Sequence, residues 1–368
     1  VLTFPMADGG EGSLDAVLPA WLQPALTMST VDALGRSRDA HYGLDLDGHR
    51  AVIEAAQANG LPHVLDATPE PLRADSYGVG LIAASVIERG ARDVTIFLGG
   101  SASTDGGSGL LRALGARFLD ANGTELAPGG GALASLETID LSALKPGVLE
   151  TSWRIAVDVT NPLTGSHGAA HVFAPQKGAT ASDVAVLDAG LTRLAEVLAA
   201  TPLVAQRGFS AAGIAALPGI GAAGGTAAPL VALFGAELVR GAQLVADTIG
   251  LSDEIGTADV IISGEGRLDA QSLEGKVVDY LRGAKSTTAF LVVVAAIVDL
   301  TPEQWSSAGI DAALPLGSGV ENRKELFQYA APLLEARGAH AIAEWLDPTD
   351  LDEEFRDDEG DGIAAESD

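Results

Sequence analysis

Residues 264–276, GEGRLDAQSLEGK, combine glycines, carboxylates, an arginine and a lysine directly after an apolar run. Arginine forks onto carboxylates or phosphates, and an acidic side chain binds Mg²⁺ or accepts a proton. We expect a strand to end at Ser263, a turn to follow through Gly264 and Gly266, and a helix to begin near Gln271, because open α/β sheets bind ligands at such carboxyl ends. The candidate catalytic residues are Glu265, Arg267, Asp269 and Lys276, with Gly264 and Gly266 beside the ligand.

This stretch is not a P-loop. The pattern G-x-x-x-x-G-K-[ST] requires glycine where Ala270 stands and Ser or Thr where Val277 stands. A salt-bridged turn, in which the two glycines serve only the backbone geometry, remains the alternative interpretation.

The stretch PMADGGEG, residues 5–12, places two carboxylates around a glycine pair ahead of a predicted helix. Glycines let a backbone approach a phosphate, and paired carboxylates bind Mg²⁺ directly or through water. Gly9 and Gly10 are therefore candidate binding residues, and Asp8 and Glu11 are candidate metal ligands. An N-capped turn without a ligand is the alternative.

Three further glycine-rich stretches carry polar groups: residues 98–109, 158–180 and 218–229. Small-residue loops of this kind cradle anions at helix N-termini, and lysine is a common phosphate binder. Only five lysines occur in the chain, and two of them, Lys177 and Lys276, lie in glycine-flanked motifs. The candidate nucleotide- or substrate-binding residues are Ser101, Asp105, Asn161, Gln176, Lys177, Gly224 and Gly225, and Asp158 is a third candidate metal ligand. The stretch around Gly224 could equally be a close helix approach. His167 and His171 lack the H-E-x-x-H context of a zinc pair.

Together these loops favour phosphoryl transfer, whose catalysis is mostly positioning and charge neutralisation by Mg²⁺ and cationic side chains. The residues alone therefore predict a kinase-like enzyme.

The pattern of elements is that of an α/β protein, because strand-like and helix-like segments alternate and glycines mark several junctions. We expect helices over residues 12–21, 77–90, 181–200 and 323–346, a hairpin over 41–54 turning at Asp47–Gly48, and strands over 94–98, 155–159, 258–263, 289–298 and 312–316. Residues 1–5 resemble the end of a strand.

Composition narrows the class of partner. The net charge of −28 argues against nucleic acids and anionic membranes, and the absence of cysteine excludes disulfides and thiolate sites. No apolar run reaches the length of a membrane span and no signal peptide is evident, so we expect a cytoplasmic protein that acts on small molecules. Residues 347–368 hold eleven acids and one arginine, and we expect them to be disordered.

The glycine-rich stretches, in their order and spacing over residues 1–345, resemble the signature blocks of the bacterial glycerate kinase family of the type that yields 2-phosphoglycerate. The resemblance implies ATP- and Mg²⁺-dependent phosphorylation of D-glycerate, in a cleft of a two-domain α/β protein. Residues 1–45 and 240–346 would form a flavodoxin- or Rossmann-like domain, incomplete at its N-terminal part, and residues 46–239 an inserted α/β domain.

The chain departs from the family pattern in three places. Members usually begin with a strand and a loop of the form A-P-D-S-F-K-G, which has no counterpart here, so we expect this segment to be missing. Thr104 and Ala270 stand where asparagine and glycine are common, and Ile297–Val298 replace a usual glycine. A catalytically inactive protein of the same family that binds small acids or nucleotides is therefore the alternative function. A Rossmann oxidoreductase is disfavoured, because no G-x-G-x-x-G motif lies between a strand and a helix.

Overall fold

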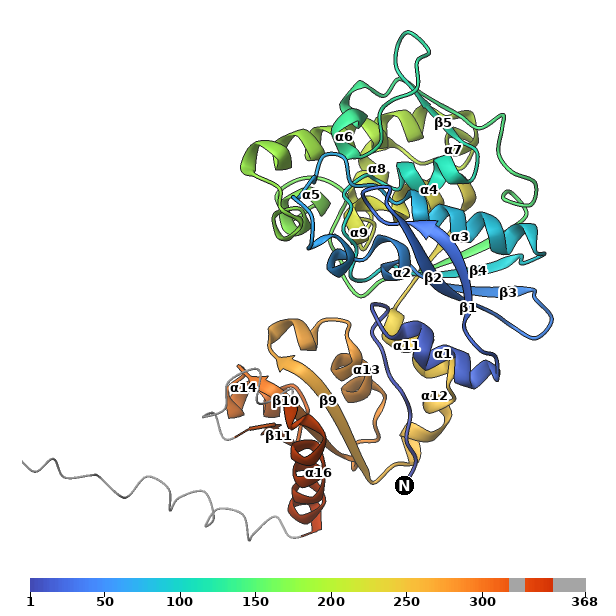
Figure 1. Ribbon diagram of the computed structural model, residues 1–368. Helices are drawn as coiled ribbons and strands as arrows, with labels where there is room; N and C mark the ends of the chain where they lie inside the picture. The colour runs from blue at the N-terminus through green and yellow to red at the C-terminus, as the bar shows by residue number, and fades with distance from the viewer. Residues whose placement is uncertain (318–327, 347–368) are drawn as a thin grey trace, which may run out of the picture. The chain divides into compact units, whose positions relative to one another are not determined.

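The computed structural model describes residues 1–317 and 328–346, which fall into two compact units. Unit 1 is Val1–Leu251, and unit 2 begins at Ser252. Each unit is an α/β assembly with its own sheet, and each is described by itself (Figure 1).

A six-stranded sheet forms the centre of unit 1. Its order is β1 (Leu26–Val31), β2 (Ser37–Leu44), β3 (Arg50–Glu54), β4 (Asp93–Phe97), β7 (Ser152–Ala156) and β8 (Glu237–Val239). Strands β3, β4, β7 and β8 are parallel, whereas β1 and β2 form an antiparallel hairpin joined to β3. The carboxyl ends of four strands therefore meet at one edge, and the beginning of antiparallel β2 lies at that same edge.

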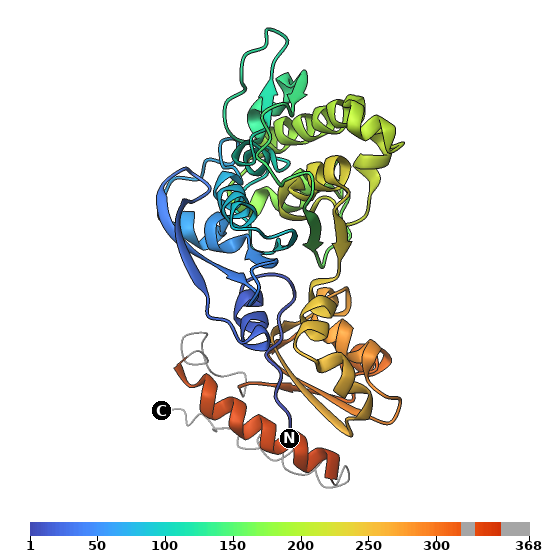
Figure 2. The same cartoon turned by 90° about the vertical axis from the view of Figure 1, so that its right-hand side faces the viewer.

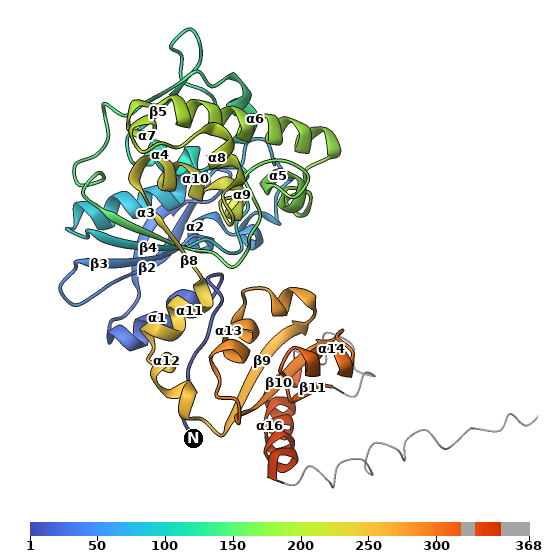
Figure 3. The same cartoon turned by 180° about the vertical axis from the view of Figure 1, so that it is seen from behind.

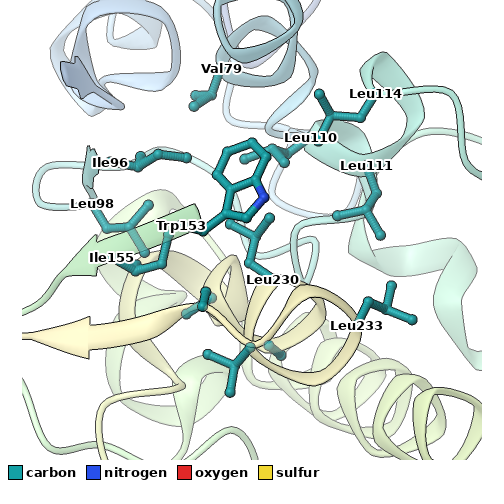
Figure 4. Packing of buried hydrophobic residues seen from close by; sticks show 14 of the residues in the cluster. Val79, Ile96, Leu98, Leu110, Leu111, Leu114, Trp153, Ile155, Leu230 and Leu233 are labelled. Atoms are coloured by element: carbon teal, nitrogen blue, oxygen red, sulfur yellow. The ribbon is translucent and has the colours of Figure 1, made fainter. Parts of the chain in front are cut away.

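Helices cover both faces of this sheet. Successive side chains of a strand point to opposite faces, and in these strands both faces carry apolar side chains. Val52, Phe97 and Ala156 pack against α1 (Ser13–Trp21) and α11 (Gly241–Thr248). The opposite face, which includes Ile96 and Ile155, packs against α3 (Tyr77–Glu88) and α4 (Ser108–Ala113). Figure 4 shows Trp153 of β7 surrounded by leucines of α4 and of the π-helical turn η4 (Leu230–Phe234). Such dense apolar packing fixes the strand ends that carry the polar loops.

The long helix α6 (Ala181–Ala200) lies beside η2 (Gly130–Ser135) and the small ribbon of β5 (Arg117–Leu119) and β6 (Thr138–Asp140) (Figure 2). The remaining elements of unit 1 are α2 (Ala56–Asn59), η1 (Leu61–Val64), α5 (Ala169–Phe173), η3 (Pro175–Lys177), α7 (Pro202–Gln206), α8 (Ala211–Ala216), α9 (Ala222–Gly225) and α10 (Ala227–Pro229), and α12 (Leu251–Glu254) joins the units.

Unit 2 contains a parallel sheet of order β11 (Ala312–Pro315), β10 (Phe290–Val298), β9 (Val260–Leu268). The central strand β10 is buried on both faces, against α13 (Val277–Ala284) and α16 (Ala330–Leu346), which lie on opposite sides of the sheet (Figure 3). The other described elements are η5 (Ile255–Thr257), η6 (Ala270–Leu273) and α14 (Pro302–Ser307).

Most predicted elements are confirmed. Helices α1, α3 and α6 form where the sequence predicts them, and so does the hairpin of β2 and β3. Its turn is longer than the predicted two-residue turn at Asp47–Gly48, because residues 46–49 separate Asp45 from Arg50, whose carbonyl accepts the Asp45 N–H, and only Gly48 of these has a positive φ, of 67°. The strand predicted at residues 1–5 is wrong, because the chain has no regular structure before α1. The final helix is described from Ala330 onward, and the predicted acidic tail, 347–368, lies outside the described residues.

The two compact units differ from the predicted domains. The boundary expected near residue 45 falls between β2 and β3, which pair with each other, and residues 240–251 belong to unit 1. Cross-strand pairing between Gly43 and Val52 therefore places both sides of that boundary in one sheet.

Within the part of the chain that the structure describes, no helix combines the length and the apolar composition needed to span a bilayer.

Candidate active site

The carboxyl edge of the unit 1 sheet brings together loops that are far apart in the sequence. Gly99, after β4, donates its N–H to the carbonyl of Gly9 at 3.0 Å. Gly241, after β8, donates its N–H to Asp158 Oδ1 at 2.9 Å, and Asp158 follows β7. The predicted stretches 5–12, 98–109 and 158–180 therefore meet at one edge through Gly9, Gly99 and Asp158, as the parallel strand order requires.

Glycine is required here because the loops pack backbone against backbone. A Cβ on Gly99 would lie 2.4 Å from Gly10 Cα, and a Cβ on Gly241 would lie 2.5 Å from the carbonyl oxygen of Asp8. Both distances are far below van der Waals contact. Gly9 and Gly10 thus hold the Asp8 carboxylate against the neighbouring strand ends.

We predict that Gly99→Ala destabilises the chain by about 1–3 kcal/mol, the usual cost of overpacking. The added methyl group can be accommodated only if the loop of Gly9 and Gly10 moves. Urea unfolding measures the change. The control is Gly213→Ala, whose Cβ meets nothing closer than the Ser210 hydroxyl at 3.1 Å. Equal stability of the two variants would contradict the close packing described here.

Asp158 is the most perturbed carboxylate of this edge. Its Oδ1 accepts from Gly241, while its Oδ2 is buried and has no hydrogen-bond partner among the described residues. Burial, followed by the negative charge of Asp8, raises the pKa of Asp158 to about 7. A buried carboxylate oxygen beside a second carboxylate is a site that attracts a cation.

Glu11, the third predicted metal ligand, faces another part of the edge, where a Cβ on Gly100 would lie 3.3 Å from Glu11 Oε1. Across residues 1–317 and 328–346, no three His, Asp or Glu side chains are gathered as they would be around a metal ion. The structure thus pairs Asp8 with Asp158 and does not bring the predicted set of three into one cluster.

Lys177 reaches the same edge from the helical turn η3. Its side chain is buried, and Nζ donates to Ser101 Oγ at 3.1 Å and to the Ser103 carbonyl at 2.5 Å. Burial lowers the pKa of Lys177 to about 7, although the charge of Asp105 acts in the opposite direction. An ammonium group held by neutral oxygens gains its full charge when an anion binds nearby.

Asp105 stabilises the loop of residues 98–109 through hydrogen bonds. Its fully buried carboxylate accepts from the backbone N–H groups of Ser76, Gly107 and Gly109 and from the hydroxyls of Ser76 and Ser103. These partners all lie within the chain, so the structure presents Asp105 as the organiser of the loop that carries Ser101 and Ser103.

The other predicted binding residues of unit 1 lie around this loop. Asn161 donates from Nδ2 to the His167 carbonyl at 2.8 Å, and Gln176 is exposed. Gly224 accepts from the N–H of Gly106 through its carbonyl, and a Cβ on Gly224 would lie 2.3 Å from the carbonyl oxygen of Ser103. Gly225 also has a positive φ, of 86°. Gly224 therefore packs its backbone against the loop of residues 98–109. This agrees with the close approach that the sequence analysis gave as the alternative to a ligand-binding loop.

In unit 2, the turn predicted through Gly264 and Gly266 is wrong. Strand β9 continues to Leu268, and Gly264, Glu265 and Arg267 lie opposite Val294, Ala295 and Ile297 of β10. The glycines interrupt the apolar pattern there, but strand pairing includes Gly264 and resumes at Arg267, after Gly266. Glu265 and Arg267 therefore share one face of a strand, and Arg267 NH1 donates to Asp299 Oδ2 at 2.5 Å.

Asp269 and Lys276 begin the two helical segments after β9. Asp269 Oδ1 accepts the backbone N–H of Gln271 at 2.9 Å, while Ser272 Oγ accepts the N–H of Asp269, which makes a reciprocal cap of η6. Lys276 stands at the N-cap of α13. The predicted helix start near Gln271 is thus a short 3₁₀ turn, and the α-helix begins at Val277.

Sequence reasoning missed three side chains at the unit 1 edge: Asn59, Arg38 and His63. Asn59 is buried and donates from Nδ2 to Ser103 Oγ at 2.8 Å. Its position at the end of the short helix α2, next to Gly60, is the signal that could have drawn attention to it. Arg38 and His63 stand in no recognisable motif, and only the fold brings them to this edge.

The opposite, amino-terminal edge of the sheet holds a cavity of about 750 Å³ lined by Asp93, Ser152 and Glu237 among others. None of the predicted site residues lines it. The predicted site residues of unit 1 therefore lie away from this cavity.

These observations define an α/β protein whose glycine-rich sheet edge carries the carboxylates of Asp8 and Asp158 and the buried Lys177. Residues 1–346 match the family model "Glycerate kinase family". The chain is 41% identical to glycerate 2-kinase of Escherichia coli (strain K12) over 276 residues, which cover 75% of this chain and 70% of that protein. It is 36% identical to glycerate kinase of Bacillus subtilis (strain 168) over 341 residues, 92% of this chain and 87% of that protein.

A solved structure gives the same result. The crystal structure of a protein assigned as glycerate kinase 2 from Salmonella typhimurium LT2 superposes with a TM-score of 0.76 at 36% identity and covers 93% of this chain and 88% of that one. The chain belongs to the glycerate kinase family.

Proposed function

We propose that this chain is a glycerate kinase that transfers the γ-phosphoryl group of ATP to the 2-hydroxyl of D-glycerate and releases 2-phosphoglycerate and ADP. The observation that carries the proposal is the buried Lys177 ammonium beside the Ser101–Ser103 loop, at the sheet edge that also holds Asp8 and Asp158, in a chain of this family.

Lys177 serves as a phosphate-binding residue. An ammonium group has three N–H donors, and two of them are directed to Ser101 and Ser103. We assign the third to a phosphate oxygen. Because a bound anion favours the charged ammonium, phosphate binding raises the pKa of Lys177 from about 7 and draws a proton from solvent.

Asp8 and Asp158 fit Mg²⁺. This ion is usually held by one or two carboxylates, with phosphate oxygens and water completing its shell. The buried and unpartnered Oδ2 of Asp158 beside Asp8 supplies such a carboxylate pair, and Glu11 lies in the same loop. Bound Mg²⁺ neutralises the charge of the phosphates. The carboxylates themselves orient the ion and lose the proton that Asp158 carries near neutral pH.

The reaction forms a bond between the 2-oxygen of glycerate and the γ-phosphorus, and breaks the bond from that phosphorus to the oxygen that bridges to the β-phosphate. The electron pair of the broken bond stays with ADP. From the sequence motif of unit 2 alone, we assign the role of accepting the hydroxyl proton to Glu265 or Asp269. Arg267 and Lys276 of the same motif are assigned to neutralising the triphosphate or the substrate carboxylate.

We predict that one of two isosteric variants, Glu265→Gln or Asp269→Asn, lowers kcat by about 10²–10⁴-fold, the usual contribution of a general base. An amide retains the oxygen that caps η6, so Asp269→Asn keeps its bond to Gln271. Steady-state kinetics at saturating ATP identifies which variant is impaired. The control is Glu274→Gln, an exposed carboxylate of the same segment. Turnover within threefold of the unsubstituted chain in both variants would remove both residues as the base.

The proposed function itself is tested by ADP release from the purified chain with ATP, Mg²⁺ and D-glycerate, compared with reactions that lack glycerate. We expect release that depends on both glycerate and Mg²⁺. Release that is equal with and without glycerate would contradict the proposal.

A further inference from the structure

We infer that Arg38, supported by His63, binds the carboxylate of the substrate at the carboxyl edge of the unit 1 sheet. This inference rests on the proposed function and specifies its substrate class as a short hydroxy acid that must carry a free carboxylate.

The topology brings Arg38 to the edge. Arg38 is the second residue of β2, which runs antiparallel to β3 with Leu44 opposite Ala51. The beginning of β2 therefore lies beyond the carboxyl end of β3, on the side where β4 and β7 deliver Gly99 and Asp158.

Arg38 lacks a hydrogen-bonded counter-charge. Its Nε is buried and has no hydrogen-bond partner among the described residues. The nearby carboxylate of Asp32 is already engaged, because Oδ2 accepts from Arg36 Nε at 2.6 Å and Oδ1 accepts from the backbone N–H groups of Leu34 and Arg36. Asp66 is likewise paired with Arg36. A half-buried guanidinium in this situation favours an anion from outside the chain.

His63, which belongs to η1, lies near Arg38. Burial and the charge of Arg38 both lower the pKa of His63. The His63 ring makes a hydrogen bond with the Ala56 carbonyl, and a Cβ on Gly60 would lie 2.9 Å from His63 Cδ2. Because Gly60 has no side chain, the His63 ring can pack against α2, and this packing fixes the position of the ring.

The η1 segment is bonded directly to the phosphate-binding loop. Leu61 donates its N–H to the Gly100 carbonyl at 2.9 Å, and Gly60 forms a β-bridge with Ser101, the residue that accepts from Lys177. Glu11 lies near both residues: a Cβ on Gly100 would be 3.3 Å from Glu11 Oε1, and the negative charge of Glu11 acts to raise the pKa of His63. The segment that carries His63 and the loop that receives the Lys177 ammonium are thus bonded to each other.

Arginine suits this role because its planar fork matches the two oxygens of a carboxylate. A neutral analogue, D-glyceramide, offers the same hydroxyl groups without the charge. The site should therefore discriminate strongly between D-glycerate and D-glyceramide.

The test compares Arg38→Met and Arg38→Lys with Arg73→Met, a matched control whose guanidinium is exposed and paired only with Glu70. We expect Arg38→Met to raise KM for D-glycerate by about 30–100-fold, to change KM for ATP by less than about twofold, and to abolish the preference for D-glycerate over D-glyceramide. Arg38→Lys, which keeps the charge but not the fork, should be intermediate, and Arg73→Met should behave as the unsubstituted chain.

An unchanged KM for D-glycerate in Arg38→Lys and Arg38→Met, or an equal rise of KM for ATP, would overturn the inference while leaving the kinase proposal intact. If the unsubstituted chain shows no turnover, the kinase proposal fails, and calorimetric titration with D-glycerate decides the inference separately. Binding that Arg38→Met removes would support it, and absence of binding to the unsubstituted chain would overturn it.

Discussion

Replacing Lys177 by methionine should reduce kcat/KM for glycerate phosphorylation by about 10³-fold or more, comparable to the loss of a cation that stabilises a transferring phosphoryl group. Lys177 Nζ is the cationic group fixed between Ser101 Oγ and the Ser103 carbonyl. Methionine fills a similar volume and removes only the charge and the donors. Steady-state kinetics measures the loss.

The same substitution should stabilise the ligand-free chain near neutral pH. The pKa of Lys177 is about 7 in the folded chain and 10.5 in its ordinary state. Between these pH values the unfolded chain binds a proton that the folded chain does not, so Lys177 costs stability that is regained only as pH rises toward 10.5. Lys177→Met removes this cost, and its advantage in urea unfolding should be greater at pH 7 than at pH 10.

The control is Lys145→Met, whose exposed ammonium pairs with Glu88 at 2.8 Å. That variant should retain turnover and show no such pH-dependent gain. A Lys177→Met chain that remains active would show that its ammonium group serves packing alone.

Asp158→Asn should lower turnover at limiting Mg²⁺ by about 10²–10³-fold, because an amide oxygen replaces one member of the carboxylate pair. The amide oxygen can still accept from the N–H of Gly241, so the loop keeps its position. Higher Mg²⁺ concentrations should recover part of the activity. Titration of turnover with Mg²⁺ measures the shift, and Asp15→Asn, an exposed acid of α1, is the control.

The stability of this variant should change in the opposite direction to its activity. The pKa of Asp158 is about 7 in the folded chain, above its ordinary 3.8. Between these values the folded chain holds a proton that the unfolded chain has lost, so stability falls as pH rises from about 4 to 7 and stays low above 7. Asp158→Asn should therefore be more stable by about 1–3 kcal/mol at pH 8 and equal to the unsubstituted chain near pH 3. An unchanged pH profile of unfolding would contradict the burial of this carboxylate beside Asp8.

Local sequence patterns predicted the elements that depend on local forces. The leucines and valines of α6 repeat with a helical period, and its N-terminus has the reciprocal Thr180–Asp183 cap, so its bounds follow from the sequence. The position of the β2–β3 hairpin also follows from the Asp47–Gly48 dipeptide, whereas its turn is longer than the two residues expected, because residues 46–49 separate Asp45 from Arg50.

The prediction for β9 failed because glycine is ambiguous. Gly264 and Gly266 resemble a turn in the sequence, yet β9 pairs with β10 at Gly264 and on both sides of Gly266, so the strand continues to Leu268. Pairing with a strand about 30 residues later in the chain is a tertiary effect that outweighs the low strand propensity of glycine.

The candidate site was predictable only in its glycine-rich loops. Asp8, Asp158 and Lys177 stand in loops whose composition indicates anion and metal binding, and the structure places these loops at one sheet edge. Arg38 and His63 carry no such signal, because their function depends on the antiparallel direction of β2 and on the bond between η1 and Gly100. Their partners are distant in sequence, so no local pattern marks them.

Phosphorus NMR of the reaction of this chain with ATP, Mg²⁺ and D-glycerate, with the Lys177→Met chain alongside, tests the proposed kinase activity and the role of Lys177 together. We expect a new signal of 2-phosphoglycerate and stoichiometric ADP from the unsubstituted chain, and neither from Lys177→Met. Unchanged ATP with the unsubstituted chain, or a product phosphorylated at another oxygen, would contradict the proposed activity.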